Sequence, residues 1–410
     1  MENRNAKIIL YILIGLIVLA ATFSGGLWTG FLLKSATSNL FLPATQESVS
    51  ITPAVDQDTL FKPFWQAWDT VHEQFVDQPL DDTLLMQGAI RGMLSALGDP
   101  HTGYMDPIEF QQANAPLEGE YEGIGAYVDT TAEYLTIISP MPDTPAEAAG
   151  LKPGDQVVAI DGEDMTGVSG DLVLRKVLGP AGTKVTLTIR REGMEDFDVT
   201  ITRAKIILRS VTSEIKDENI AYIVLTSFAS DTAASLRDQL RELLKENPKG
   251  IILDLRNNGG GYLDTAVDVV SQFIGEGVVL IEEYGDGTQQ SYRAKSNGLA
   301  TDDSLPLVVL VNEGSASASE ITAGAIQDLK RGVLIGAKTY GKGSVQQWTT
   351  LVDDAGAIRV TVARWLTPNG RQINGIGLTP DIPVEYTEED FNAGRDPQLE
   401  RAIQYIQEGK

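Results

Sequence analysis

The sequence has no cysteine and only two histidines, His72 and His101, among its 410 residues. The missing cysteine excludes disulfides, thiolate zinc sites and a cysteine nucleophile. With so few histidines we expect no metal site, and the sequence suggests no cofactor. Positive charge is scarce too, with 32 Lys and Arg against 57 Asp and Glu and a formal net charge of −25. Such a chain repels phosphate, so nucleic acid is not an expected partner.

The first residues read as a membrane segment. Residues 8–33 carry no charge and are long enough to span a hydrocarbon core of about 30 Å. Arg4 and Lys7 precede this run, which favours a cytoplasmic N-terminus and an extracytoplasmic location for the rest of the chain. We therefore expect a single-pass anchor in the cell membrane over residues 1–34. The alternative is a cleaved signal peptide, for which Ala36-Thr37-Ser38 is a weak cleavage site.

Composition divides the remaining chain into five segments. The expected segments are a linker (35–56), a helical region (57–115), a strand-rich domain (116–205), an α/β core (206–390) and a C-terminal helix (391–410). Ser, Thr, Pro and Ala dominate the linker. Apolar residues recur every three or four positions in the helical region, whereas short alternating runs and glycine turns mark the strand-rich domain.

Strand and helix patterns alternate in the expected core. Strands are predicted at 220–225, 251–254 and 307–311, helices at 231–246, 262–273 and about 317–328, and a hairpin at 344–351 and 358–365. This alternation predicts helices packed on a sheet.

Two motifs characterise the strand-rich domain. Residues 121–128 contain a glycine turn before a strand, which can direct successive backbone N–H groups toward a carboxylate, although any hairpin can carry such a turn. Residues 145–158 resemble the signature of bacterial PDZ domains. That resemblance implies a β-sandwich or barrel-like module that binds C-terminal tails. The amides that it implies for the tail carboxylate belong to Ile124, Gly125 and Ala126.

Two further motifs follow predicted buried strands. Residues 254–262 include three consecutive glycines, which form either a structural turn or half of an oxyanion hole. Residues 314–321, G-S-A-S-A-S-E-I, suit either a nucleophile elbow or a serine-rich helix cap. Spacing alone does not choose among Ser315, Ser317 and Ser319.

The last motif places Lys342 between two glycines, just before a predicted strand. A lysine buried there can lose its proton and act as a base. The competing interpretation is a phosphate-binding loop that begins at Gly336. Gly343 stands where that loop needs Ser or Thr, so nucleotide binding is disfavoured.

Taken in order, these motifs resemble the carboxyl-terminal processing peptidases, which are tail-specific serine proteases. The resemblance covers about residues 57–385 and implies a core of the ClpP and crotonase type, with a serine–lysine dyad. Carried onto this sequence, it implies Ser317 as nucleophile, Lys342 as general base, Gln346 as the residue that positions the lysine, and an oxyanion hole from Ala318 with Gly260 or Gly261.

The expected protein is therefore a membrane-anchored serine endopeptidase that hydrolyses peptide bonds through an acyl-enzyme. Its expected partners are proteins with unstructured C-terminal tails and the membrane, and a second copy of the chain is a further candidate. The alternative is a catalytically inactive PDZ adaptor on a protease scaffold. Neither histidine is expected to catalyse, and Glu320 is expected to favour the helix dipole.

Overall fold

The computed structural model describes residues 56–409, and the chain divides into two units after Asp81. The described part of the first unit consists of α2 (Gln57–Leu60) and α3 (Lys62–Gln74). The anchor expected over residues 1–34 lies outside the described residues. Within residues 56–409, no helix combines the length and apolar character needed to cross a bilayer.

The second unit starts with α4 (Asp82–Ser95), β1 (Gly103–Met105) and α5 (Pro107–Glu118). A capping box begins α5, because the Asp106 carboxylate accepts from the Glu109 N–H while the Glu109 carboxylate accepts from the Asp106 N–H. Strand β1 pairs antiparallel with β18 (Ala357–Leu366). A segment that precedes the strand-rich domain is thus joined to a strand near the other end of the chain.

The strand-rich segment forms an antiparallel domain of its own. Its elements are β2 (Glu120–Gly123), β3 (Ala126–Asp129), β4 (Leu135–Pro140), α6 (Pro145–Ala148), β5 (Gln156–Ile160), β6 (Glu163–Asp164), α7 (Gly170–Val177), β7 (Lys184–Arg190), β8 (Phe197–Thr202) and β9 (Ala204–Ile207). The main sheet has the order β3-β4-β5-β7-β8, and β2 pairs with β9. The alternation predicted for β7 is confirmed, since Val185, Leu187 and Ile189 are fully buried.

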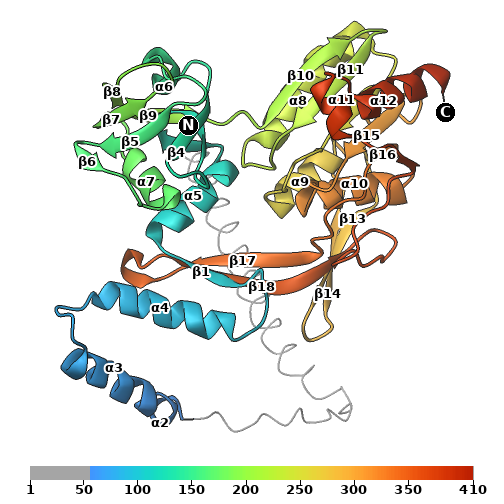
Figure 1. The fold of residues 1–410 in the computed structure, drawn as a ribbon. Helices are drawn as coiled ribbons and strands as arrows, with labels where there is room; N and C mark the ends of the chain where they lie inside the picture. Colours follow the sequence, from blue (N-terminus) through green and yellow to red (C-terminus); the bar gives the residue numbers. More distant parts are fainter. Residues whose placement is uncertain (1–55, 410) are drawn as a thin grey trace, which may run out of the picture. The chain divides into compact units, whose positions relative to one another are not determined.

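The core that follows is a mixed sheet covered by helices (Figure 1). Its sheet has the order β10-β11-β12-β15-β16-β19, antiparallel only between β10 and β11. The strands are β10 (Val211–Lys216), β11 (Ile220–Leu225), β12 (Ile251–Asp254), β15 (Leu307–Val311), β16 (Val333–Gly336) and β19 (Ile382–Pro383). The helices are α8 (Thr232–Leu243), η2 (Leu244–Glu246), α9 (Leu263–Val270), α10 (Ala318–Asp328), α11 (Glu388–Asn392) and α12 (Pro397–Glu408). The three predicted strands coincide with β11, β12 and β15, and the predicted helices agree within a few residues.

The two faces of this sheet bury different partners, because successive side chains of a strand point to opposite sides. On β12, Ile251 and Leu253 belong to the larger apolar cluster, together with side chains of α8, α9 and α10. Ile252 belongs to a second cluster with Ile406 of α12. Both faces are therefore covered, and the loops at the carboxyl ends of the parallel strands come together at one edge, where α/β proteins place their ligands.

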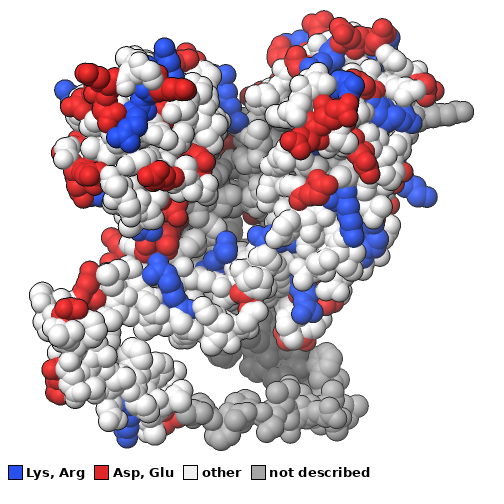
Figure 2. Space-filling view, viewed as in Figure 1, with Lys and Arg blue, Asp and Glu red and all other residues white. Residues whose placement is uncertain are grey.

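A second sheet in the core contributes the predicted hairpin. It has the order β1-β18-β13-β14, with β17 (Ser344–Thr350) also paired to β18, and includes β13 (Val278–Tyr284) and β14 (Gln289–Arg293); η3 (Val352–Asp354) links β17 to β18. The surface is acidic as expected. Figure 2 shows Asp and Glu side chains spread over the visible face, with Lys and Arg between them.

Candidate active site

The candidate site is a cleft of about 700 Å³ at the carboxyl ends of the parallel strands. We call it the serine cleft. Ser317, Lys342, Gln346, Gly260 and Gly261 all line it, although they come from three separate segments of the sequence. The fold therefore brings together most of the residues predicted for catalysis, while Ala318 is buried directly behind Ser317.

Ser317 occupies a strained turn between β15 and α10. Its backbone has φ 54° and ψ −115°, a conformation that side-chain-bearing residues rarely adopt. This is the geometry of a nucleophile elbow, in which a sharp strand-to-helix turn exposes a hydroxyl at the positive end of a helix. A Cβ added to Gly260 would lie 2.8 Å from the Cβ of Ser317. Only glycine leaves room there for the elbow.

The structure separates Ser317 from the other two serines of the run. The hydroxyl of Ser315 is buried and donates to the Leu255 carbonyl oxygen at 2.8 Å, and that of Ser319 is buried and donates to the Asn258 carbonyl oxygen at 2.8 Å. The Ser317 side chain instead faces the first turn of α10, where it forms a capping box with Glu320. Ser317 is the one serine of the three that lines the cleft.

The oxyanion candidates can also be compared. The Gly260 N–H already donates to the Asn258 side-chain oxygen at 2.9 Å. In the described part of the chain the Gly261 N–H has no acceptor, and neither does the Ala318 N–H in the first turn of α10, where helical N–H groups lack an intrahelical partner. The N–H groups of Ala318 and Gly261 are therefore the pair available to bind an oxyanion.

Lys342 lies in the loop between β16 and β17. Burial lowers the pKa of its amine, the positive charge of Arg359 lowers it further, and Glu320 opposes both. A lowered pKa increases the fraction of neutral amine, which is the form that accepts a proton. The Trp365 indole N–H donates to the Lys342 carbonyl oxygen at 3.0 Å and fixes the backbone from which the side chain extends.

A buried carboxylate, that of Glu320, joins the serine turn to the lysine loop. It accepts from the Ser317 N–H at 3.0 Å and from the Lys342 N–H at 2.8 Å. It also accepts from the Thr339 hydroxyl at 2.5 Å and the Gly341 N–H at 2.7 Å. The sequence predicted only that Glu320 favours the helix dipole, but its carboxylate also holds the serine turn and the lysine loop together. The S-x-x-E spacing from Ser317 signals the local part of this contact, but nothing in the sequence signals the link to the lysine loop.

Among the described residues the Gln346 carboxamide has two hydrogen-bond partners, neither of which is Lys342. Its Nε2 donates to Ser344 Oγ at 2.8 Å and to Thr361 Oγ1 at 3.2 Å. Thr361 in turn donates to Asp99 at 2.5 Å. Sequence reasoning did not select Thr361 or Asp99, because they lie far from the motifs along the chain.

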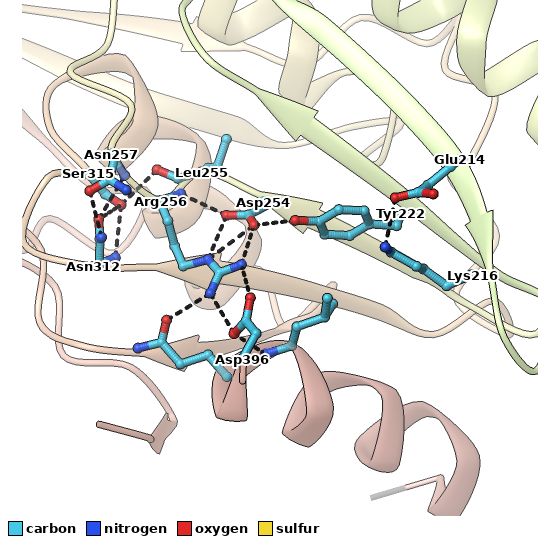
Figure 3. Close-up of polar contacts among 12 residues, drawn as sticks. Glu214, Lys216, Tyr222, Asp254, Leu255, Arg256, Asn257, Asn312, Ser315 and Asp396 are labelled. Carbon is cyan, nitrogen blue, oxygen red and sulfur yellow. Dashed lines mark hydrogen bonds and ion pairs between the residues drawn. The ribbon is translucent and has the colours of Figure 1, made fainter. Parts of the chain in front are cut away.

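Figure 3 shows contacts that join the glycine-rich loop after β12 to the serine loop after β15 and to α12. Asn312 accepts from the Asn257 N–H at 2.8 Å, and its amide donates to the Asn257 side chain at 2.9 Å. Arg256 donates to Asp254 and also to Asp396, the N-cap residue of α12. The glycine-rich loop is thereby tied both to the serine loop and to the C-terminal helix.

The residues predicted to bind the tail carboxylate lie in the strand-rich domain. Ile124 and Ala126 line a largely apolar groove of about 320 Å³ between β3 and α7, which we call the PDZ groove. Gly125 has φ 81°, and a Cβ there would lie 2.4 Å from the Cβ of Thr144, so a side chain cannot be accommodated. Burial raises the pKa of the Tyr121 phenol, and hydrogen bonds from the Ala126 and Gly125 N–H groups oppose that rise. Tyr121 therefore lies close to two of the three predicted carboxylate donors.

A serine at a strained turn, a half-buried lysine in the same cleft and backbone N–H groups without acceptors are features expected of a serine hydrolase. Comparisons with known proteins agree. The family model of peptidase family S41 matches residues 219–384, that of the PDZ domain matches residues 136–191, and that of the "activating protease CtpB N-terminal domain" matches residues 21–108. Carboxy-terminal processing protease CtpA of Bacillus subtilis is 36% identical over 347 residues, which cover 84% of this chain and 73% of that protein. The carboxyl-terminal-processing protease of a Synechocystis species is 39% identical over 327 residues, covering 78% and 76%.

A solved structure of a putative S41 protease from Bacteroides fragilis, 17% identical, aligns over 82% of this chain and 93% of that one with a TM-score of 0.51, which concerns the fold alone. The chain belongs to peptidase family S41, the carboxy-terminal processing serine proteases, and carries a PDZ domain.

Proposed function

We propose that this protease works through a Ser317–Lys342 dyad. Neutral Lys342 takes the hydroxyl proton of Ser317 while Ser317 Oγ attacks the substrate carbonyl carbon. The N–H groups of Ala318 and Gly261 hold the oxyanion that forms. The protonated lysine then gives its proton to the leaving amine. Water, activated by the same lysine, releases the acyl group from Ser317.

One observation carries this proposal. Of the three hydroxyls in the serine run, that of Ser317 alone lines the cleft with Lys342, while the other two are used inside the fold. The alternative of an inactive PDZ adaptor is not favoured, because an adaptor has no need of a strained serine beside a lysine with a lowered pKa.

We further propose that the PDZ groove selects substrates by their free C-termini. The apolar lining suits an apolar last residue, and the amides of Ile124, Gly125 and Ala126 suit its carboxylate. The uncharged run at residues 8–33 supports a membrane anchor, with the protease on the extracytoplasmic side. Exposed apolar side chains on α3, among them Phe64 and Trp65, support a homo-oligomer.

The test measures cleavage of a tailed protein by the full chain and three variants. Ser317→Ala and Lys342→Arg should each reduce kcat by at least about 10³-fold, because arginine keeps the charge but cannot act as a base. Ser315→Ala, which removes a buried hydroxyl outside the cleft, is the matched control and should retain most activity. Full activity of a folded Lys342→Arg protein would exclude the lysine as base.

A further inference from the structure

The starting observation is that one residue, Thr361, lies between the serine cleft and a loop that precedes the PDZ domain. Thr361 is in the middle of β18, whose two edges are occupied by different strands. On one edge it is the register partner of Gln346 in β17. On the other, its N–H donates to Thr102 Oγ1 at 3.0 Å, just before β1 begins to pair with β18.

The hydroxyl groups of Thr102 and Thr361 donate their hydrogens toward Asp99. The Asp99 carboxylate accepts from Thr102 Oγ1 at 2.6 Å and from Thr361 Oγ1 at 2.5 Å. Hydrogen bonds from Thr102 and then Thr361 lower the pKa of Asp99 to about 2, so it is ionised at any working pH. An ionised carboxylate can only accept, so Thr361 must donate its single hydroxyl hydrogen to Asp99.

That direction fixes the orientation of the Gln346 carboxamide. With its hydrogen committed to Asp99, Thr361 offers only lone pairs to Gln346 and therefore accepts from Nε2 at 3.2 Å. Ser344 Oγ accepts the second Nε2 hydrogen at 2.8 Å. Both amide hydrogens are then used, and Oε1 has no partner among the described residues. A register shift between Val345 and Gln346 also marks a bulge, a device that re-aims a side chain.

We propose that Asp99 and Thr361 are positioning residues of the protease: they orient Gln346 so that its Oε1 accepts from the Lys342 amine. This inference rests on the proposed dyad and on Gln346 as its third member. Neither residue lines the serine cleft. The chain Asp99–Thr361–Gln346–Lys342 makes the loop before β1 part of the catalytic apparatus, although it lies more than 200 residues from Ser317 in sequence.

The surrounding charges matter for the readout. The amine of Lys342 interacts electrostatically with Arg359 and Glu320. His101, which lies in the loop before β1 with Asp99, interacts with both Lys342 and Asp99. The Thr361→Val substitution leaves every one of these charges in place and removes only the hydroxyl. An acceptor binds an ammonium more strongly than an amine, so losing Oε1 lowers the pKa of Lys342 further.

The experiment measures peptide hydrolysis against pH for Thr361→Val, Thr361→Ser and Asp99→Asn in the full chain. We expect Thr361→Val and Asp99→Asn to reduce kcat by about 10- to 100-fold with little change in KM. Thr361→Ser keeps the hydroxyl and should restore most of kcat. In Thr361→Val the rise of kcat/KM with pH should move to lower pH.

A double variant tests whether the residues act in series. If they do, Asp99→Asn combined with Thr361→Val should be no slower than the slower single variant. Asp286→Asn is the matched control, because Asp286 accepts from Thr288 in the same way but at the distant β13–β14 turn. It should leave kcat unchanged.

Two results would overturn the inference. The first is a wild-type kcat for Thr361→Val. The second is a loss of kcat that parallels a loss of thermal stability, while the rise of kcat/KM with pH stays where it is in the wild type. Should Thr361→Val fail to fold, Asp99→Asn is judged by the same criteria. Failure of the dyad is recognised separately, because Lys342→Ala and Gln346→Ala would then both remain active.

Discussion

The serine cleft and the PDZ groove are built in different ways. The groove is lined by residues between 111 and 208, and the turn that we propose binds a carboxylate is a single short run of sequence. The cleft is lined from six stretches between residues 110 and 365, joined by the parallel sheet and the β17–β18 hairpin. A local motif specifies the turn proposed for the carboxylate, whereas the cleft depends throughout on contacts between distant segments. Variants that break such contacts should therefore affect the cleft more than the groove.

The largest effect is expected at Glu320, which links two of those stretches. Glu320→Ala leaves four buried or half-buried donors without an acceptor, so we expect the free energy of unfolding to fall by at least about 3 kcal/mol. Where the variant still folds, kcat should fall by about 100-fold, because the serine turn and the lysine loop are no longer held together.

Denaturant unfolding and single-turnover kinetics measure the two effects of Glu320→Ala. The control is Glu313→Ala, an exposed residue just before the serine run, which should change neither. Wild-type stability for Glu320→Ala would show that the four donors find other partners, and would remove Glu320 from the description of the site.

The groove should respond at a single local contact. A peptide with a free C-terminus should be cleaved better than its amidated twin. Tyr121→Phe removes a hydroxyl that lies close to the Gly125 and Ala126 N–H groups and can compete with a tail carboxylate for them, so it should lower KM for the free-carboxylate peptide by about 2- to 10-fold. The amidated peptide should not gain.

Tyr134→Phe is the control for this change, because Tyr134 lies in the same domain and its hydroxyl contacts Thr166 instead. An increase in KM for Tyr121→Phe would mean that the phenol donates to the tail carboxylate rather than competing with it.

A smaller effect is expected from the charge beside the lysine. Arg359 lowers the pKa of Lys342, so Arg359→Gln should raise that pKa. Activity requires the neutral amine, and the rise of kcat/KM with pH should therefore move to higher pH, with a similar plateau. The exposed Arg364, on the same strand, provides the control Arg364→Gln, which should leave the profile in place. A shift to lower pH in Arg359→Gln would contradict the electrostatic account.

Local patterns in the sequence correctly predicted several strands and the motif residues that meet in the serine cleft. Buried apolar runs predicted β11, β12 and β15, and the alternating pattern predicted β7. The motifs also led to Ser317, Lys342 and the two glycines that line one cleft. The sequence could not choose among the three serines on spacing, because the choice depends on which carbonyl oxygens lie across from Ser315 and Ser319 in the folded chain.

The partners of the motifs were not predictable for the same reason. Asp99 and Thr361 meet because β1 pairs with β18, and Glu320 reaches Lys342 because β15 and β16 are neighbours in the sheet. No periodicity or spacing records these contacts. They depend on strand order, which is a property of the whole fold.

The smallest effect is expected at the contact between the glycine-rich loop and the C-terminal helix. Asp396 accepts two hydrogen bonds from Arg256, at 2.9 and 2.8 Å, and caps α12 through the Leu399 N–H. Asp396→Asn keeps the cap but removes the charge. We expect a loss of about 1–2 kcal/mol in stability, with kcat nearly unchanged, because Asp254 continues to hold Arg256.

The pH dependence of that loss distinguishes charge from shape. Burial opposes ionisation of Asp396, but hydrogen bonds from Arg256 outweigh it and hold the pKa of the carboxyl below its usual 3.8. A group whose pKa is depressed by folding stabilises the protein above its unfolded pKa and ceases to do so as pH falls through its folded pKa. The stability difference between wild type and Asp396→Asn, measured by urea unfolding, should therefore be full near neutral pH and shrink as the pH falls below about 4. An unchanged difference at acid pH would assign the effect to the geometry of the cap, and the ion pair with Arg256 would then contribute nothing to holding the loop.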